Sequence, residues 1–166
     1  MTVRTLVSHG CFSRTGITNV LSESDRRGIE AALRETDMTP LSDRLIGNLS
    51  GGERQRAYLA MLLAQDPDYL LIDEGTSSMD IAHQRKTMEL FARLAQCGKS
   101  VVTVSHDLPL SFSISSQILV MKCGKVVLSG TPEELAGQPE RLREILGIGL
   151  APSRTDESLY AYELIR

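Results

Sequence analysis

The chain has 166 residues, enough for one domain with its own hydrophobic core. Its net charge of −3 argues against a nucleic-acid-binding protein, which would present a basic surface. No apolar run approaches the roughly 18 residues of a membrane-spanning helix, and the N-terminus has no apolar stretch typical of a secretory signal. The three scattered cysteines suggest neither a disulfide framework nor a zinc site.

The first third of the chain is expected to be helical and to contain no strand. Residues 2–10 carry apolar side chains on one face and end at a glycine, as a short helix does. The polar stretch 11–22 predicts a loop. Ser24 can cap a second helix that continues through Met38. The inner side of this helix is predicted to consist of Ile29, Ala32, Leu33 and Thr36.

The stretch 49–56, Leu-Ser-Gly-Gly-Glu-Arg-Gln-Arg, predicts the start of a helix. Ser50 and Glu53 have the spacing of a capping box, and the two glycines between them leave backbone N–H groups open to another molecule. Such an N-terminus attracts anions, because its amides are unpaired and the helix dipole is positive there. The apolar run 57–64 indicates that the helix is buried. An ordinary capped core helix would give the same local pattern.

The run 69–72 is apolar and ends in Asp73 and Glu74. This pattern predicts a buried parallel strand with two carboxylates at its carboxyl end, where open α/β sheets bind their ligands. A solvated acidic turn is the alternative. The β-branched run 101–104 predicts a second buried strand. A helix over 80–96 joins the two strands, with a predicted core face of Ile81, Met88, Phe91, Leu94 and Ala95. Strand, helix and strand together predict a doubly wound α/β core.

The last third mixes short helices and strands. Residues 108–116 predict a poor helix, and 117–129 predict a hairpin that turns at Cys123-Gly124. Thr131-Pro132 starts helices that run to about Ile145. The tail holds a polar loop and a strand-like stretch over 159–165.

Four of these stretches resemble motifs of one family, the ABC-type ATPases: the signature (49–53), the Walker B strand (69–74), the D-loop (77–80) and the H-loop (105–107). Their order and spacing identify the chain as a member. The implied fold is α/β, the C-terminal two-thirds of a P-loop NTPase (ABC-type) domain within residues 1–150. A helical subdomain over about 2–65 is followed by part of a RecA-like, mostly parallel sheet over about 66–150, and 151–166 form a C-terminal tail.

The resemblance implies that ATP and Mg²⁺ are the cofactors. Asp73 corresponds to the residue that coordinates Mg²⁺ through water, and Glu74 to the general base for the attacking water. His106 corresponds to the residue that contacts the γ-phosphate and helps to hold that water.

Other residues are implied to act on a nucleotide held by a second subunit. The signature residues Ser50, Gly51, Gly52 and Glu53 correspond to those that meet the γ-phosphate of the opposite subunit. Asp80 resembles the D-loop acid that works across the interface, and it can cap a helix at the same time. This geometry implies a head-to-tail dimer with two nucleotides between the subunits.

The sequence departs from the family in two ways. Gly75 replaces the usual proline after the Walker B acid and loosens that turn. No Gly-x-x-x-x-Gly-Lys-Ser/Thr phosphate loop is present, because Gly98-Lys99-Ser100 has Arg93 at the first-glycine position and lies between a predicted helix and a strand. The Q-loop and the adenine-stacking aromatic are also missing. We therefore expect a truncated chain with negligible ATP turnover on its own.

Further local similarity narrows the family. Residues 2–7 resemble the segment after the Q-loop of importers, and 60–66 and 80–84 resemble subunits that serve ferric siderophores, haem and cobalamin. The implied protein is the ATPase subunit of an iron-chelate importer, cytoplasmic and peripheral on the inner face of the membrane. Its implied partners are permease subunits, a second ATPase subunit and, indirectly, a substrate-binding protein.

The sequence leaves one other function open and excludes another. The chain could be a non-enzymatic remnant that only lends its signature loop to a complete partner. A DNA-repair or chromosome-organising ATPase would share the signature and the Walker B strand, but it should also carry coiled-coil heptads, and the sequence has none.

Overall fold

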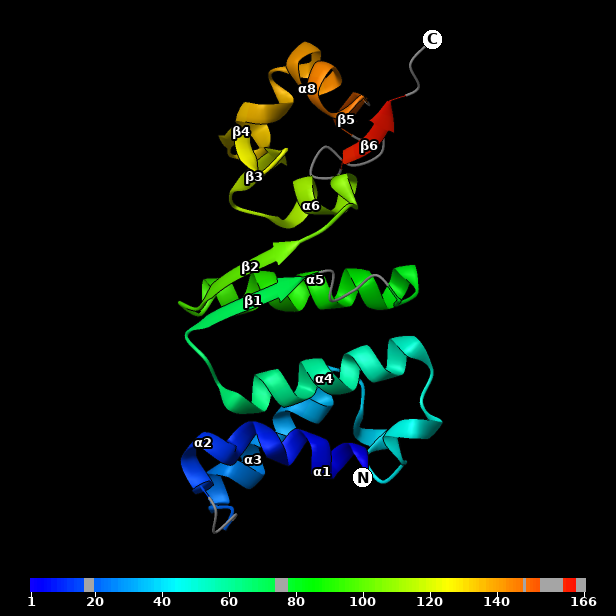
Figure 1. Cartoon of the computed structure of the whole chain (residues 1–166), viewed down its shortest axis with the longest axis vertical. Helices are drawn as coiled ribbons and strands as arrows, with labels where there is room; N and C mark the ends of the chain where they lie inside the picture. Colours follow the sequence, from blue (N-terminus) through cyan, green and yellow to red (C-terminus); the bar gives the residue numbers. More distant parts are fainter. Residues whose placement is uncertain (17–19, 74–77, 148, 153–159, 164–166) are drawn as a thin grey trace. The chain divides into compact units, whose positions relative to one another are not determined.

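The structure is a computed structural model that describes residues 1–16, 20–73, 78–147, 149–152 and 160–163. The chain forms two compact units, Met1–Val104 and Ser105–Arg166 (Figure 1). Among the described residues, no helix is long and apolar enough to cross a membrane.

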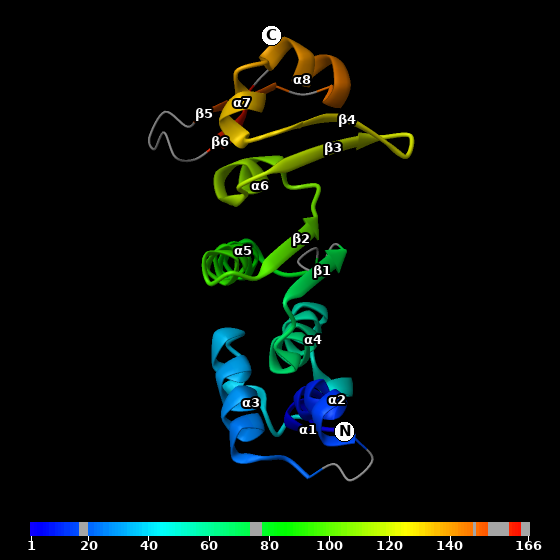
Figure 2. The same cartoon turned by 90° about the vertical axis from the view of Figure 1, so that its left-hand side faces the viewer.

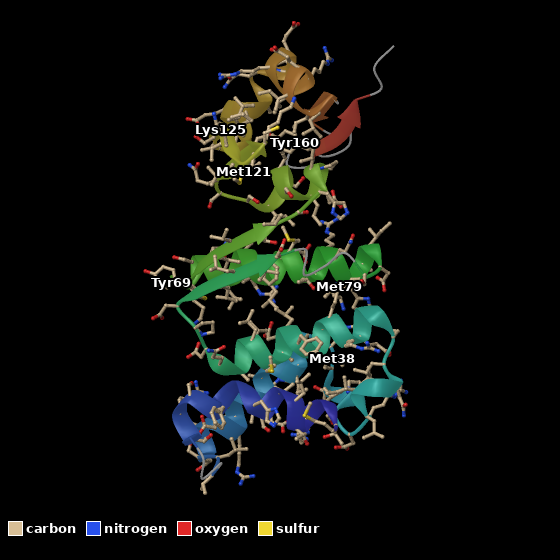
Figure 3. All side chains as sticks on the ribbon, viewed as in Figure 1. Met38, Tyr69, Met79, Met121, Lys125 and Tyr160 are labelled. Carbon is tan, nitrogen blue, oxygen red and sulfur yellow. The ribbon has the colours of Figure 1, made fainter. Side chains whose placement is uncertain are left out.

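The first unit begins with a helical part, as predicted. Its helices are α1 (Val3–Ser8), α2 (Phe12–Thr15), α3 (Glu23–Glu35) and α4 (Gly51–Gln65), with short 3-10 turns at His9–Cys11, Thr39–Leu41 and Ile46–Asn48. Both α1 and α3 pack against α4. Met38, labelled in Figure 3, is fully buried in the core that they share. That core also contains Val3, Leu6, Val7, Cys11, Ile29, Ala32, Leu33, Leu49, Ala57, Ala60 and Ala64.

Two expectations for this part were wrong. Helix α2 lies within the stretch 11–22 that was expected to be a loop. The cap of α3 is Ser22, because its hydroxyl accepts from the Asp25 amide at 3.1 Å while the Asp25 carboxylate accepts from the Ser22 amide at 3.0 Å. Ser24 lacks this reciprocal partner and lies within the helix. The predicted inner side of α3 is buried, as expected.

The second part of this unit is a parallel strand pair joined by a helix, as predicted. Strands β1 (Tyr69–Asp73) and β2 (Ser100–Val104) pair in parallel, with Leu71 opposite Val102. Helix α5 (Ile81–Gln96) connects them and packs against β2 on one side of the pair (Figure 2). The residues that α5 buries are Thr87, Met88, Leu90 and Phe91.

The other side of the strand pair is uncovered within the described residues. Tyr69 and Leu71 are 76% and 78% exposed, and Val102 and Val104 are 54% and 56% exposed. The two strands, expected to be buried, are therefore covered on one face only within the described residues. Two predicted core positions of α5 are also wrong. Ile81 is 84% exposed because the buried stripe of α5 begins only at Thr87, and Ala95 lies beyond its end.

The second unit contains the predicted hairpin and short helices. Strands β3 (Ile118–Lys122) and β4 (Lys125–Gly130) are antiparallel, and the turn has positive φ at Cys123 (51°) and Gly124 (74°), as a type I′ turn requires. The remaining elements are α6 (Leu108–Ile114), α7 (Pro132–Ala136), α8 (Pro139–Leu146), β5 (Gly149–Pro152) and β6 (Tyr160–Glu163). Strands β5 and β6 pair in antiparallel fashion.

A separate small core holds this unit together. Phe112 and Tyr160 meet edge to face with ring centroids 5.5 Å apart. The buried residues around them are Val120, Leu128, Leu135, Leu142 and Leu150.

Candidate functional site

The signature stretch forms the capped N-terminus of α4, a helix of 15 residues. The Ser50 hydroxyl accepts from the Glu53 amide at 3.3 Å, and the Glu53 carboxylate accepts from the Ser50 amide at 2.7 Å. The predicted capping box is confirmed. The first-turn amides of Gly51 and Gly52 belong to the group that an α-helix leaves without an intrahelical acceptor. This end of α4 therefore has the donors that a phosphate oxygen requires.

The Glu53 carboxylate caps its own helix. The hydrogen bond from the Ser50 amide is the main cause that lowers the pKa of the Glu53 carboxyl, and the positive charge of Arg44, 3.8 Å away, lowers it further. Glu53 is therefore ionised at neutral pH and holds the cap in place.

The segment 78–80 lies against this end of α4. A Cβ on Gly52 would come within 2.9 Å of the Ser78 carbonyl oxygen, whereas a Cβ on Gly51 would lie an ordinary 3.6 Å from the Ser78 Cβ. The glycines were expected to admit another molecule. At Gly52, the group that approaches is backbone of the same chain, and Gly51 remains exposed.

Asp80 caps α5, as the sequence allowed. One carboxylate oxygen accepts from the His83 amide at 3.0 Å, and the other lies 2.7 Å from the His83 ring Nδ1. The hydrogen bond from the His83 amide is the largest cause that lowers the pKa of Asp80. The helix-cap role is thus observed, and the role across a dimer interface stays a prediction.

Asp73 is the last residue of β1 and is exposed. It pairs with Val104, so its carboxylate lies at the carboxyl end of the parallel pair, as predicted. Glu74, Gly75 and Ser77 lie outside the described residues. Within the described part of the chain, no group of three or more His, Cys, Asp and Glu side chains gathers. One exposed carboxylate nevertheless suits Mg²⁺ bound to a nucleotide, because that ion takes one or two carboxylates with phosphate oxygens and waters.

His106 is exposed at the start of the second unit. Its neighbours form a tight turn, in which the Asp107 amide donates to the Ser105 hydroxyl at 3.1 Å and the Asp107 carboxylate caps α6 through the Leu110 amide at 3.1 Å. The turn fixes the backbone at His106. The role of His106 at a γ-phosphate stays a prediction.

Lys99 is engaged away from any phosphate loop. Its ammonium group lies 2.6 Å from the Asp66 carboxylate and donates to the Pro67 carbonyl at 2.9 Å. Together with its position just before β2, this contact agrees with the expectation that Gly98-Lys99-Ser100 is no phosphate cradle.

Two residues near the site were missed in the sequence. Gln55 and His83 both contact the segment 78–80. His83 stands three residues after Asp80, the spacing of a helix cap, so the sequence carries a signal for this contact. Gln55 is 23 positions from Ser78, and only the fold brings the two together.

The chain resembles known proteins in sequence. Residues 2–77 match the family model for the ABC transporter domain. The chain is 37% identical over 171 aligned residues to the iron(3+)-hydroxamate import ATP-binding protein FhuC of Bacillus subtilis (strain 168), covering 100% of the chain and 63% of that protein. It is 34% identical to the ferric enterobactin transport ATP-binding protein FepC of Escherichia coli (strain K12), covering 89% of the chain and 55% of that protein.

A solved structure supports the fold. A metal-chelate type ABC transporter in an inward-facing conformation matches 99% of the chain and 67% of its own length, with a TM-score of 0.80 and 23% identity. The chain spans less than two-thirds of the length of each of the two relatives named above. The chain is similar to ATP-binding proteins of ABC transporters, and its 166 residues correspond to part of such a protein.

Proposed function

We propose that the chain supplies the signature, Walker B, D-loop and H-loop of an ATP-hydrolysing subunit of an iron-chelate importer. The observation that carries this proposal is the capped start of α4, which presents Gly51 and Gly52 beside the segment 78–80. The iron-chelate assignment is supported by two relatives whose names give hydroxamate and enterobactin transport.

Each residue has a proposed part in the reaction. The Ser50 hydroxyl and the amides of Gly51 and Gly52 bind a γ-phosphate held by a second subunit in a head-to-tail dimer. Asp73 holds Mg²⁺ through water, and the ion, when bound, neutralises phosphate charge. Glu74 accepts the proton of the attacking water and His106 helps to hold that water.

The proposed setting is the cytoplasmic face of the membrane. There the subunit pairs with a second ATPase subunit, docks on permease subunits and serves, indirectly, a substrate-binding protein. A second candidate is a non-enzymatic chain that only lends its signature to a complete partner. This candidate would draw the Gly-x-x-x-x-Gly-Lys-Ser/Thr loop, which supplies most nucleotide contacts, from that partner.

Two proteins separate these candidates: the 166-residue chain, and a hybrid in which the Bacillus subtilis hydroxamate relative supplies the part of the cassette that the chain does not span. We expect negligible ATP turnover from the chain and measurable turnover from the hybrid. Glu74→Gln should abolish the turnover of the hybrid because the water loses its base. Ser50→Arg should abolish it by crowding the γ-phosphate.

Thr131→Ala is the matched control. Thr131 and Glu134 form a capping box like that of Ser50 and Glu53, with amide contacts of 3.0 and 3.2 Å. This variant loses a helix cap but should keep ATP turnover. A folded hybrid that binds ATP but does not hydrolyse it would favour the non-enzymatic candidate, and turnover by the isolated chain that Glu74→Gln removes would refute it. Uptake of labelled ferric hydroxamate by a strain that carries the hybrid in place of the relative tests the substrate class.

A further inference from the structure

The segment 78–80 is held by contacts to two different helices. On the α5 side, the Thr87 hydroxyl lies 3.5 Å from the Met79 sulfur, and Asp80 caps the helix through His83. Met79 is only 7% exposed, and Figure 3 shows it near the N-terminal ends of α4 and α5. These contacts fix the segment to the start of α5.

The contact to α4 comes from Gln55. Its side-chain carbonyl Oε1 accepts a hydrogen bond from the Ser78 amide at 3.1 Å. Gln55 lies one turn after Gly51 and is half-buried, so its side chain is held at the side of the helix rather than at its phosphate-facing end. The contact therefore uses a side chain of α4 and none of its N-terminal amides.

Gly52 makes this contact possible. The Ser78 carbonyl lies so close to Gly52 that a side chain there would displace it, while Gly51 has ordinary space. The amide of Ser78 thus reaches Gln55 and its carbonyl passes over Gly52. Two independent features of α4, one hydrogen bond and one close approach, place the same residue.

We propose that Gln55 is a positioning residue that joins the segment 78–80 to the first turns of α4. The signature amides and Asp80 then form one body, which meets a partner's nucleotide as a unit. The role of this body at a nucleotide rests on the proposed function. The contact between Gln55 and Ser78 is independent of the proposed function and can be tested without nucleotide.

The test is amide hydrogen exchange at Ser78, followed by NMR on the 166-residue chain. Gln55→Met keeps the length and packing of the side chain but removes the strong acceptor, so exchange at Ser78 should rise roughly two- to twelvefold. Gln55→Glu keeps an acceptor oxygen and should retain the protection of the wild type. Gln65→Met changes an exposed side chain at the other end of α4 and should leave Ser78 unaffected.

A second pair of variants tests the close approach. Gly52→Ala should also raise exchange at Ser78, whereas Gly51→Ala should not, and circular dichroism verifies that each variant is folded. Equal exchange at Ser78 in the wild type and Gln55→Met overturns the proposal, as does exchange at the unstructured rate in the wild type. Because no nucleotide is present, this result is independent of whether the hybrid cassette hydrolyses ATP.

Discussion

The Arg14 guanidinium binds the Asp25 carboxylate, with 2.9 Å between Nε and Oδ1. Its two terminal nitrogens donate to the carbonyls of Ala64 and Gln65, each at 2.8 Å. Those carbonyls lie in the last turn of α4, where the helix itself offers no donor. One side chain therefore joins the end of α4 to the first turn of α3 and stabilises the helical part that carries the signature.

We expect Arg14→Ala to lower the free energy of unfolding by about 1–3 kcal/mol, because it leaves two carbonyls without their charged donor and removes one of the donors to the largely buried Asp25 carboxylate. Arg14→Lys keeps the charge but not the planar guanidinium, so its free energy of unfolding should lie between those of the wild type and Arg14→Ala. Arg27→Ala is the control. It breaks an exposed pair with Glu23, and its effect should stay below about 1 kcal/mol. Urea unfolding measures all three, and equal effects of Arg14→Ala and Arg27→Ala would contradict the capping role.

The contact between Arg14 and Asp25 predicts that the free energy of unfolding depends on pH. Hydrogen bonds from the Ser22 hydroxyl and then from Arg14 lower the pKa of Asp25 from 3.8 to about 2. Because this pKa is lower in the folded than in the unfolded chain, the unfolded chain binds the proton first as pH falls. The contribution of Asp25 to stability is thus complete above about pH 4 and is lost between about pH 4 and pH 2.

Asp25→Asn should flatten the fall in unfolding free energy between pH 4 and pH 2 relative to the wild type. A residual slope is expected because the pKa values of Glu53 and Asp80 are also lowered. Arg14→Ala should reduce the Asp25 contribution without removing it, since the Ser22 hydroxyl remains. Identical slopes in the wild type and Asp25→Asn would show that the carboxyl titrates alike in both states.

The elements that depend on local pattern were predictable from the sequence. The capping box at Ser50, the helix start at Thr131, the strand before Asp73 and the Cys123-Gly124 turn each follow from neighbouring residues, and all are observed. One failure was also local. Ser22 has an acid three residues on, the spacing of a capping box, whereas Ser24 has Arg27 there, so the sequence itself favours the cap that is observed.

At the site, the partners of Gly52 and Gln55 could not be predicted from the sequence. The sequence marks Gly52 as open to a close approach, but only the fold shows that Ser78 of the same chain is the group that approaches. The contact between Gln55 and Ser78 spans 23 positions and has no periodic signal. The proposed roles of Asp73, Glu74 and His106 rest on resemblance, because each is proposed to act on a nucleotide rather than on another residue of the chain.

Gly10 and Gly28 should respond in opposite ways to alanine. A Cβ at Gly10 would overlap the Met61 carbonyl oxygen, which belongs to the backbone of α4 and cannot move aside alone. We expect Gly10→Ala to destabilise the chain by about 1–3 kcal/mol. Gly28 lies inside α3 with open space around it, so Gly28→Ala should stabilise by about 0.5–1 kcal/mol through helix propensity. Thermal unfolding followed by circular dichroism compares the two, and a loss of stability in both would contradict the reading of Gly28.

The uncovered face of β1 and β2 should bind an apolar dye. Parallel sheets are normally covered on both faces, yet Tyr69, Leu71, Val102 and Val104 are exposed side by side within the described residues (Figure 3 labels Tyr69). We expect the chain to enhance the fluorescence of anilinonaphthalene sulfonate and to scatter light as its concentration rises.

Replacing the facing pair with opposite charges tests the cause. Leu71→Lys with Val102→Glu puts an ion pair on neighbouring strands and should reduce dye binding, at a cost in stability below about 1 kcal/mol. Leu70→Lys is the contrast, because Leu70 is 1% exposed and a charge there should unfold the strand pair. Dye binding that the double variant leaves unchanged would mean that the apolar surface lies elsewhere. Dye binding that it removes would identify this face as the part of the first unit that needs a further layer.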